Sequence, residues 1–395
     1  MSRKVVVTGL GIISALGTGA ENNMIALSEG HTGIASVEHL KTRLKDEFVL
    51  GEVKCSNDEL KHLLGINKQL LISRTCLLAF HAGREALEMS GLKEDEIKSC
   101  GLISGTTVGG MDLTEQIRDF TTEKNLKKIL SNHPCGDTTE KLASFLGIKG
   151  FTTTYNTACS SAANAIMFAA RLIKSGRADR ILAGGTDALS CFTLNGFNSL
   201  MILDRNPCRP FDQSRSGLNL GEGAGYILLE AEEVAKPGKA LVYLSGYANS
   251  NDAHHQTASS PEGTGAILSM QKAMEVAGIS CSEVSYINAH GTGTPNNDAS
   301  EARAIATLFG PNVPPYSSTK SLTGHTLGAC GGIEAVFSVK SILNQEIYAG
   351  INFTLSDEDL DISPLTHNRK GQINHVLSNS FGFGGNNSSL IFSKI

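Results

Sequence analysis

Residues 160–187 read SSAANAIMFAARLIKSGRADRILAGGTD, and this stretch decides the fold class. Its first part, 160–175, is rich in alanine and repeats apolar residues with the spacing of a helix. Its second part, 180–187, is a short, mostly apolar run with two glycines near its end, which is typical of a strand covered on both faces. A helix followed directly by such a strand predicts an α/β protein with a mostly parallel sheet.

Strands of the same kind recur along the chain, at residues 4–13, 102–110, 226–230, 242–247, 284–290 and 373–385. A second alanine-rich helical pattern covers residues 264–277. Glycines at the strand ends put loops at one edge of the sheet, where α/β proteins usually build their sites. The polar stretch 231–239 carries a mid-chain Pro-Gly and could join two halves. Both halves contain strand and glycine-loop units, which permits a duplicated architecture without showing one.

The composition limits the classes of function. A net charge of -5 and a pI near 6.1 argue against a protein that coats nucleic acid. No apolar run approaches the ~20 residues of a membrane helix, and the N-terminus lacks the apolar stretch of a signal peptide. We therefore expect a cytoplasmic protein without nucleic-acid or membrane partners. The nine cysteines are never spaced Cys-x-x-Cys, which disfavours a disulfide framework and a metal site.

Cys159 is the first candidate for chemistry, in the motif NTACSSA at residues 156–162. A cysteine at the start of a helix faces the positive end of the helix dipole and unpaired N–H groups, which favour the thiolate. The same N–H groups could hold a developing oxyanion. Ser160 and Ser161 are also ordinary capping residues. The position of Cys159 in the sequence therefore does not exclude the alternative, a buried cysteine that only packs in the core.

Two histidine motifs follow in the second half. His290 lies in NAHGTGTP at 288–295, a loop of small residues after a strand, where it can reach into a cavity. Lys320 precedes His325 in SSTKSLTGH at 317–325, and the order of residues is wrong for a phosphate-binding Walker loop. The plainer alternative for His290 is a loop histidine whose hydrogen bonds are satisfied locally.

The fourth motif, NSFGFGGNN at 379–387, follows another predicted strand. Its glycines allow a loop to swing, and Phe383 between them could gate an apolar tunnel. A structural turn with packed aromatic residues is the alternative.

Taken in this order, the four motifs resemble the decarboxylating β-ketoacyl-[acyl-carrier-protein] synthases of the thiolase superfamily. The resemblance extends over the whole chain, through VVVTGLG (5–11), GTTVGG (105–110), AGGTDA (183–188), CRPFD (208–212) and GEGAG (221–225). It implies a thiolase-like, five-layered α-β-α-β-α sandwich of two similar halves, residues 1–235 with the nucleophile and 236–395 with both histidines. It also implies a homodimer, with a heterodimer as the alternative.

The resemblance assigns roles residue by residue. Cys159 matches the nucleophile that carries the acyl chain, and His290 and His325 match the pair that drives decarboxylation of the malonyl extender. Lys320 matches a lysine that supports this polar network, and Glu334 matches a buried acid close to it.

Further roles concern the carrier protein and the gate. Thr292 and Thr294 match the threonines that bind the phosphopantetheine arm. Phe383 matches the gating phenylalanine, whose backbone N–H joins that of Cys159 in the oxyanion hole. The partner implied is acyl carrier protein, which is acidic, so we expect a basic docking patch. Its candidate residues are Lys68, Arg74, Lys124, Lys127, Lys128 and Arg209.

The implied reaction is a decarboxylative condensation that lengthens an acyl chain by two carbons, as in fatty-acid biosynthesis. Loss of CO2 leaves an enolate, and two imidazole N–H donors aimed at the thioester oxygen would stabilise it. No cofactor on the enzyme is required, because the phosphopantetheine arm belongs to the carrier. His325 also separates this chain from relatives that have asparagine in its place and from thiolases, which use a second cysteine.

Two alternatives stay open. The family usually reads GGTN after the gating phenylalanine, whereas this chain has GGNN at 384–387. That variant is similar to members dedicated to polyunsaturated pigment chains, so a ketosynthase for a specialised lipid or aryl-polyene-type pigment, with a partner subunit, is the second hypothesis. The third is a non-catalytic partner subunit, and the intact Cys159, His290 and His325 count against it.

Overall fold

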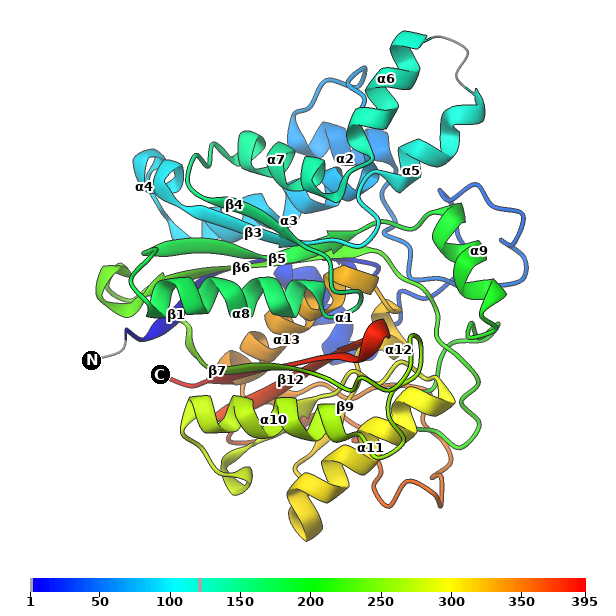
Figure 1. The fold of residues 1–395 in the computed structure, drawn as a ribbon, viewed down its shortest axis with the longest axis vertical. Coiled ribbons are helices and arrows are strands. Elements are labelled where there is room, and N and C mark those ends of the chain that lie inside the picture. Colours follow the sequence, from blue (N-terminus) through cyan, green and yellow to red (C-terminus); the bar gives the residue numbers. More distant parts are fainter. Residues whose placement is uncertain (1–2, 120–122) are drawn as a thin grey trace.

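The computed structural model describes residues 3–119 and 123–395. Figure 1 shows five layers, in which three layers of helices alternate with two layers of strands. The sandwich expected from the resemblance is therefore confirmed.

The strands of the first layer follow one order across the sheet. That order is β4 (Thr152–Tyr155), β3 (Gly101–Gly105), β5 (Arg180–Asp187), β6 (Gly223–Ala231) and β1 (Val5–Ser14). In the second layer the order is β9 (Tyr316–Ser317), β8 (Tyr286–Asn288), β12 (His375–Gly382), β13 (Asn386–Ser393) and β7 (Val242–Asn251). If the five strands of each layer are numbered in the order in which they occur along the chain, both layers have the same spatial order: third, second, fourth, fifth, first. The duplication that the sequence only permitted is therefore present in the topology.

The pairing directions repeat as well. In each half the first two pairings are parallel and the next two antiparallel. The two layers join where β1 meets β7, through the pairs Val6–Tyr243 and Val7–Val242. The prediction of a mostly parallel sheet was wrong, because the sheet is mixed. Every residue of β6 and β1 is buried, and a strand covered on both faces reads as a continuous apolar run in either direction.

The central layer explains the alanine-rich helix. It contains α8 (Ser161–Lys174), α13 (Cys330–Asn344) and α1 (Ala20–Glu29). α8 packs on β5, and α13 packs on both β6 and β12. Small residues let these backbones come close: a Cβ atom at Gly225 would lie 2.3 Å from the carbonyl carbon of Gly332. The long helices of the outer layers are α3 (Arg74–Ser90) and α7 (Cys135–Leu146) on one side, and α10 (Thr264–Ala277) and α11 (Pro295–Phe309) on the other.

The remaining helices and strands are short. The helices are α2 (Asn57–Leu64), α4 (Glu94–Ser99), α5 (Met111–Thr114), α6 (Glu123–Asn132), α9 (Cys191–Ser199) and α12 (Lys320–Thr323). The short strands are β2 (Gly17–Thr18), β10 (Glu346–Ile347) and β11 (Arg369–Lys370). Several expected strands are shorter in the structure, because their glycine-rich ends form loops. Within the described ranges, no helix combines the length and the apolar character needed to cross a membrane.

Candidate active site

Cys159 lies on the tight turn between β4 and α8. Ala158, just before it, has a φ of 52°, a left-handed conformation that bends the chain sharply. The N–H of Thr157 donates to the Ser161 hydroxyl at 2.9 Å, which closes the turn. The Cys159 side chain is buried, and the residue lies two positions before Ser161, the first residue of α8, so it stands at a helix start as the sequence predicts.

The environment of the thiol differs from the expectation. Burial raises the pKa of Cys159 to about 11, although hydrogen bonds from the backbone N–H groups of Phe383 and Cys159 and the charge of Lys320 act in the opposite direction. The backbone N–H groups favour the thiolate, as expected, but desolvation outweighs them, so the net shift of the pKa is towards the thiol. Nε2 of His325 lies 3.1 Å from the sulfur and is the nearest base.

His290 and His325 face each other beside the thiol. Their ring centroids are 5.3 Å apart and the rings are nearly perpendicular, at 87°. Burial and the charge of Lys320 hold the pKa of both histidines well below the usual value. Both rings are therefore neutral at neutral pH, and each has one N–H donor and one acceptor nitrogen.

The same three side chains offer atoms at a spacing that a metal ion could bridge. One ligand atom each from Cys159, His290 and His325 lies within 4.8 Å of the others. Histidines that bind metals usually donate their second ring N–H to a carboxylate or carbonyl. Nδ1 of His290 and of His325 has no hydrogen-bond partner among the described residues, so the supporting groups of a metal site are missing.

Lys320 and Glu334 form a buried ion pair beneath the histidines. Lys320 begins α12 and Glu334 lies on α13, and their side chains are 1% and 2% exposed. Burial lowers the pKa of Lys320, but its interactions with Glu334, Cys330 and Glu301 together outweigh burial and raise the pKa, so its ammonium group is charged. This charge is one cause of the low pKa values of both histidines.

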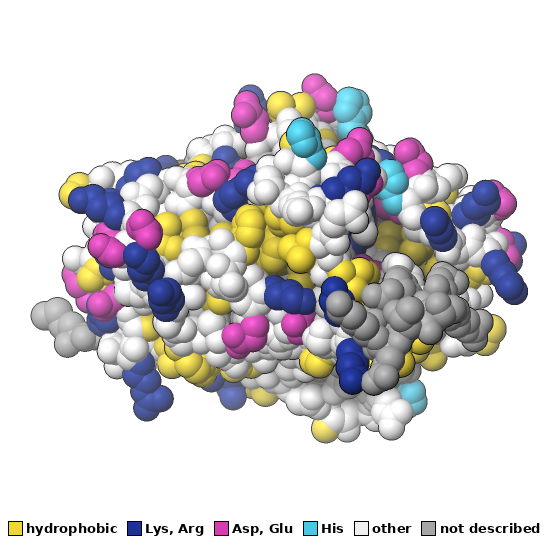
Figure 2. All heavy atoms as spheres, turned by 90° about the horizontal axis from the view of Figure 1, so that it is seen from above, with side chains coloured by type: hydrophobic (Ala, Val, Ile, Leu, Met, Phe, Trp, Pro, Cys, Tyr) yellow, Lys and Arg dark blue, Asp and Glu magenta, His cyan; other side chains and the backbone are white. Residues whose placement is uncertain are grey.

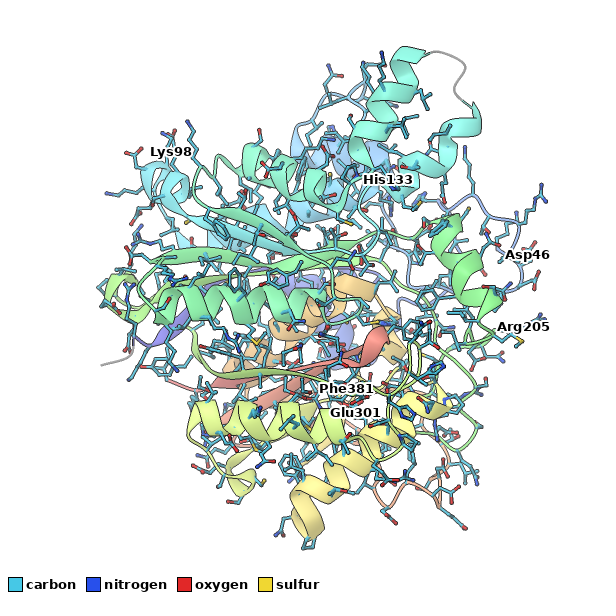
Figure 3. All side chains as sticks on the ribbon, in the orientation of Figure 1. Asp46, Lys98, His133, Arg205, Glu301 and Phe381 are labelled. Atoms are coloured by element: carbon cyan, nitrogen blue, oxygen red, sulfur yellow. The ribbon has the colours of Figure 1, made fainter. Side chains whose placement is uncertain are left out.

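Two carboxylates that the sequence reasoning missed hold the His290 loop. Glu301 accepts hydrogen bonds from the N–H groups of His290 at 2.9 Å and Gly291 at 2.8 Å. Asp298 accepts from the N–H of Gly293 at 3.1 Å. Figure 3 labels Glu301 on α11, together with Phe381 at the end of β12. One sequence feature could have identified them: Asp298 and Glu301 are two acids three residues apart, in the first part of a helix that follows the loop.

Two cavities meet at Cys159. The first, of about 230 Å³, is lined by both histidines together with Thr292 and Thr294, whose hydroxyl oxygens are 2.9 Å apart. The second, of about 430 Å³, is mainly apolar, with Val108, Phe192, Phe197, Leu200 and Leu327 among its lining residues.

Phe383 lines both cavities, as do Cys159 and Phe197. The ring of Phe383 stacks on that of Phe197, with centroids 5.8 Å apart and an angle of 15° between the planes. The threonine-lined cavity, here called the entrance, and the mainly apolar cavity, here called the apolar chamber, therefore both border Cys159 and Phe383.

The six residues predicted to dock the carrier differ in their environments. The prediction for Arg74 was wrong, because its guanidinium is buried and forms an ion pair with Glu222 at 2.6 Å, so it cannot contact a partner's surface. Lys68 pairs with Asp58 at 2.8 Å, and Arg209 pairs with Asp204 at 2.8 Å.

The remaining docking candidates lie on α6. Lys127 and Lys128 are exposed, whereas the side chain of Lys124 lies outside the described residues. Among the described residues on the face seen in Figure 2, basic and acidic side chains are intermixed.

Comparisons with known proteins agree with this geometry. Residues 2–235 match the beta-ketoacyl synthase N-terminal domain, and residues 241–354 match the beta-ketoacyl synthase C-terminal domain. The chain is 36% identical to the Vibrio harveyi protein named 3-oxoacyl-[acyl-carrier-protein] synthase 2, over 100% of this chain and 99% of that protein.

Solved structures share the fold. The ishigamide ketosynthase/chain length factor is 30% identical, with a TM-score of 0.92 and full coverage of both chains. A chain of the complex between the ketosynthase ApeO and its chain length factor ApeC from Xenorhabdus doucetiae is 32% identical, with a TM-score of 0.82, over 100% of this chain and 98% of that one. Two matched domains, identity over the full length and the fold together show that this chain belongs to the β-ketoacyl synthase family of acyltransferase enzymes.

Proposed function

We propose that this protein is a β-ketoacyl-[acyl-carrier-protein] synthase that joins an acyl group held on Cys159 to a malonyl group held on acyl carrier protein. The product is a β-ketoacyl chain two carbons longer. One observation carries the proposal: Cys159, His290 and His325 meet where a threonine-lined entrance joins an apolar chamber.

Acyl transfer comes first. The Cys159 thiol, whose pKa is about 11, gives its proton to Nε2 of His325 as the sulfur attacks the thioester carbon. The N–H groups of Cys159 and Phe383 stabilise the oxyanion that forms. The carrier thiol then leaves with a proton, and the acyl chain occupies the apolar chamber.

Condensation follows when the malonyl carrier binds. Loss of CO2 leaves an enolate, whose oxygen accepts hydrogen bonds from the Nε2–H groups of His290 and His325; between the two steps His325 changes from the Nδ1–H to the Nε2–H tautomer by proton exchange with solvent. One such donor is worth about 2.7–4 kcal/mol of barrier. The enolate carbon attacks the acyl carbon, the bond to Cys159 breaks, and the sulfur takes a proton from solvent.

The supporting roles are part of the same proposal. The charge of Lys320, held by Glu334, keeps both histidines neutral, so that His325 can accept a proton. Thr292 and Thr294 bind the phosphopantetheine arm, which the carrier brings with it. The units 1–235 and 236–395 each supply one side of the site.

The test is a direct assay. Purified protein is mixed with acyl carrier and malonyl carrier, and β-ketoacyl product and CO2 are measured by mass spectrometry and gas release. Wild-type protein should form both, and a Cys159→Ala variant should form no condensation product. Absence of product from the wild type, together with failure of iodoacetamide to label Cys159, contradicts the proposal.

A specialised acyl chain with a partner subunit is the second candidate. The apolar chamber opens beside Phe192 and Leu200, which are 65% and 45% exposed. The outer edge of β4, next to the exposed Phe151, has no neighbouring strand among the described residues. Both features suit a second subunit, and the similar ishigamide and ApeO structures are named with a chain length factor.

Two measurements separate these candidates. Light scattering reports whether the purified chain forms a homodimer or stays monomeric until a partner is added. Rates with saturated and conjugated acyl carriers report the substrate, and equal rates contradict the specialised version.

A further inference from the structure

Residues 382–386 carry the gate and run against the turn that holds the nucleophile. A Cβ atom at Gly382 would lie 3.1 Å from the backbone nitrogen of Cys159, so a larger residue would disturb this approach. Gly384 and Gly385 have φ angles of 81° and 73°, which glycine adopts without strain. Asn386 follows as the first residue of β13 and is therefore the fixed end of the gate segment.

The side-chain oxygen of Asn386 collects hydrogen bonds from both halves of the chain. The Ser160 hydroxyl donates to it at 2.6 Å, and Nδ2 of Asn164 and of Asn249 donate at 2.9 Å and 2.8 Å. Ser388, two residues further along β13, donates to Oδ1 of Asn164 at 2.7 Å and accepts from Nδ2 of Asn249 at 2.8 Å. One polar network therefore joins α8, β7 and β13 behind the nucleophile.

This network spans the two donors that flank the sulfur. Ser160 follows Cys159 directly, and Asn386 lies three residues after Phe383. The N–H groups of Cys159 and Phe383 both lower the pKa of the Cys159 thiol, and Gly382, next to Phe383, lies against the backbone nitrogen of Cys159. Stabilisation of an oxyanion requires both donors to aim at one point, and a small displacement weakens it.

We propose that Asn386 is a positioning residue, which sets the relative position of the Cys159 and Phe383 N–H groups and thereby governs acylation of Cys159. The proposal rests on the synthase function above. Asn386 is not among the described residues that line either cavity. Its effect should therefore appear in the rate of acylation and leave the binding of the acyl carrier unchanged.

The test compares two half-reactions of one variant. Single-turnover acylation of Cys159 is followed by intact-protein mass spectrometry. In Asn386→Ala its rate should fall at least about tenfold, because the loss of one hydrogen bond typically changes a rate by about that factor. The half-saturating concentration of acyl carrier should stay within twofold of wild type. Malonyl decarboxylation, measured in a Cys159→Gln background, should also stay within twofold, because His290 and His325 serve that step.

Two further variants complete the design. Asn386→Asp keeps an acceptor oxygen and should recover most of the acylation rate. Asn344→Ala removes an amide at the end of α13 that donates to the Tyr348 hydroxyl at 2.9 Å, and it should acylate like wild type.

Three results separate the possible failures. An acylation rate for Asn386→Ala equal to wild type overturns the inference. Equal losses in both half-reactions, accompanied by a lower melting temperature, reduce Asn386 to a structural residue and overturn it too. If wild-type protein itself transfers no acyl group, the proposed function fails instead.

Discussion

Replacement of Lys320 by Met tests the buried ion pair most directly. Because both side chains of the pair are at most 2% exposed, the change leaves Glu334 as an uncompensated buried acid. Breaking such a pair on one side costs about 3–5 kcal/mol in the free energy of unfolding. The double variant Lys320→Met, Glu334→Leu removes both charges, and apolar replacement of a whole pair is often neutral or stabilising. We therefore expect the double variant to regain most of the stability lost in the single variant.

The same variants change the pH dependence of acylation. The Lys320 charge lowers the pKa of His325, so its removal should raise that pKa. His325 accepts the thiol proton only when neutral, and acylation is lost as the pH falls through its pKa. The acid limb of the acylation profile should therefore move to higher pH in Lys320→Met.

Two measurements decide the outcome. Denaturant titration gives the free energies of unfolding. Single-turnover acylation between pH 5 and 8, a range around the usual histidine pKa of about 6.5, gives the pH profiles. Our reasoning is refuted if the double variant is as unstable as the single variant while the acid limb stays where it is in the wild type.

Three more predictions address single residues. Cys159→Gln should keep malonyl decarboxylation and lose condensation, because the histidines act on the malonyl extender and not on Cys159. Loss of both CO2 release and β-ketoacyl product, measured by gas release and mass spectrometry, would contradict this assignment of roles. The rate of alkylation of Cys159 by iodoacetamide should rise about tenfold per pH unit between pH 7 and 9.5 without a plateau. The reason is that the thiol pKa of about 11 keeps the thiolate scarce below pH 11. A plateau near pH 7 would instead show that Cys159 is a thiolate at that pH. Glu301→Ala leaves the N–H groups of His290 and Gly291 unpaired, and it should lower the free energy of unfolding by about 1–3 kcal/mol for each of them. The same variant should slow decarboxylation. Ser282→Ala, at an exposed position, is the control for the denaturant titration.

The sequence singled out three residues that the structure brings together, Cys159, His290 and His325, because each lies in a short motif after a strand. Cys159 and His290 follow β4 and β8 within a few residues, and His325 comes soon after β9. In a repeated topology these ends lie at equivalent places. Small residues and glycines around each motif leave space for substrate, and that requirement is visible locally.

Other properties depend on segments that meet only in the folded chain. The sequence places Cys159 at a helix start, but the burial that raises its pKa comes from the elements packed around it. The order of strands cannot be predicted from apolar runs, since buried antiparallel strands such as β6 look like parallel ones. Arg74 looks like a surface cation until Glu222, 148 residues away in sequence, is found beside it.

The division of the site between the halves has a consequence for how activity is acquired. Cys159 comes from the first half and both histidines from the second, and within the described residues the two strand layers pair through Val6–Tyr243 and Val7–Val242 of β1 and β7. A chain whose halves have formed helices but have not yet packed together through α13, which contacts both β6 and β12, is therefore inert. During refolding, the return of condensation should therefore lag behind the return of helical circular dichroism, and the interval would report the time the two halves need to join.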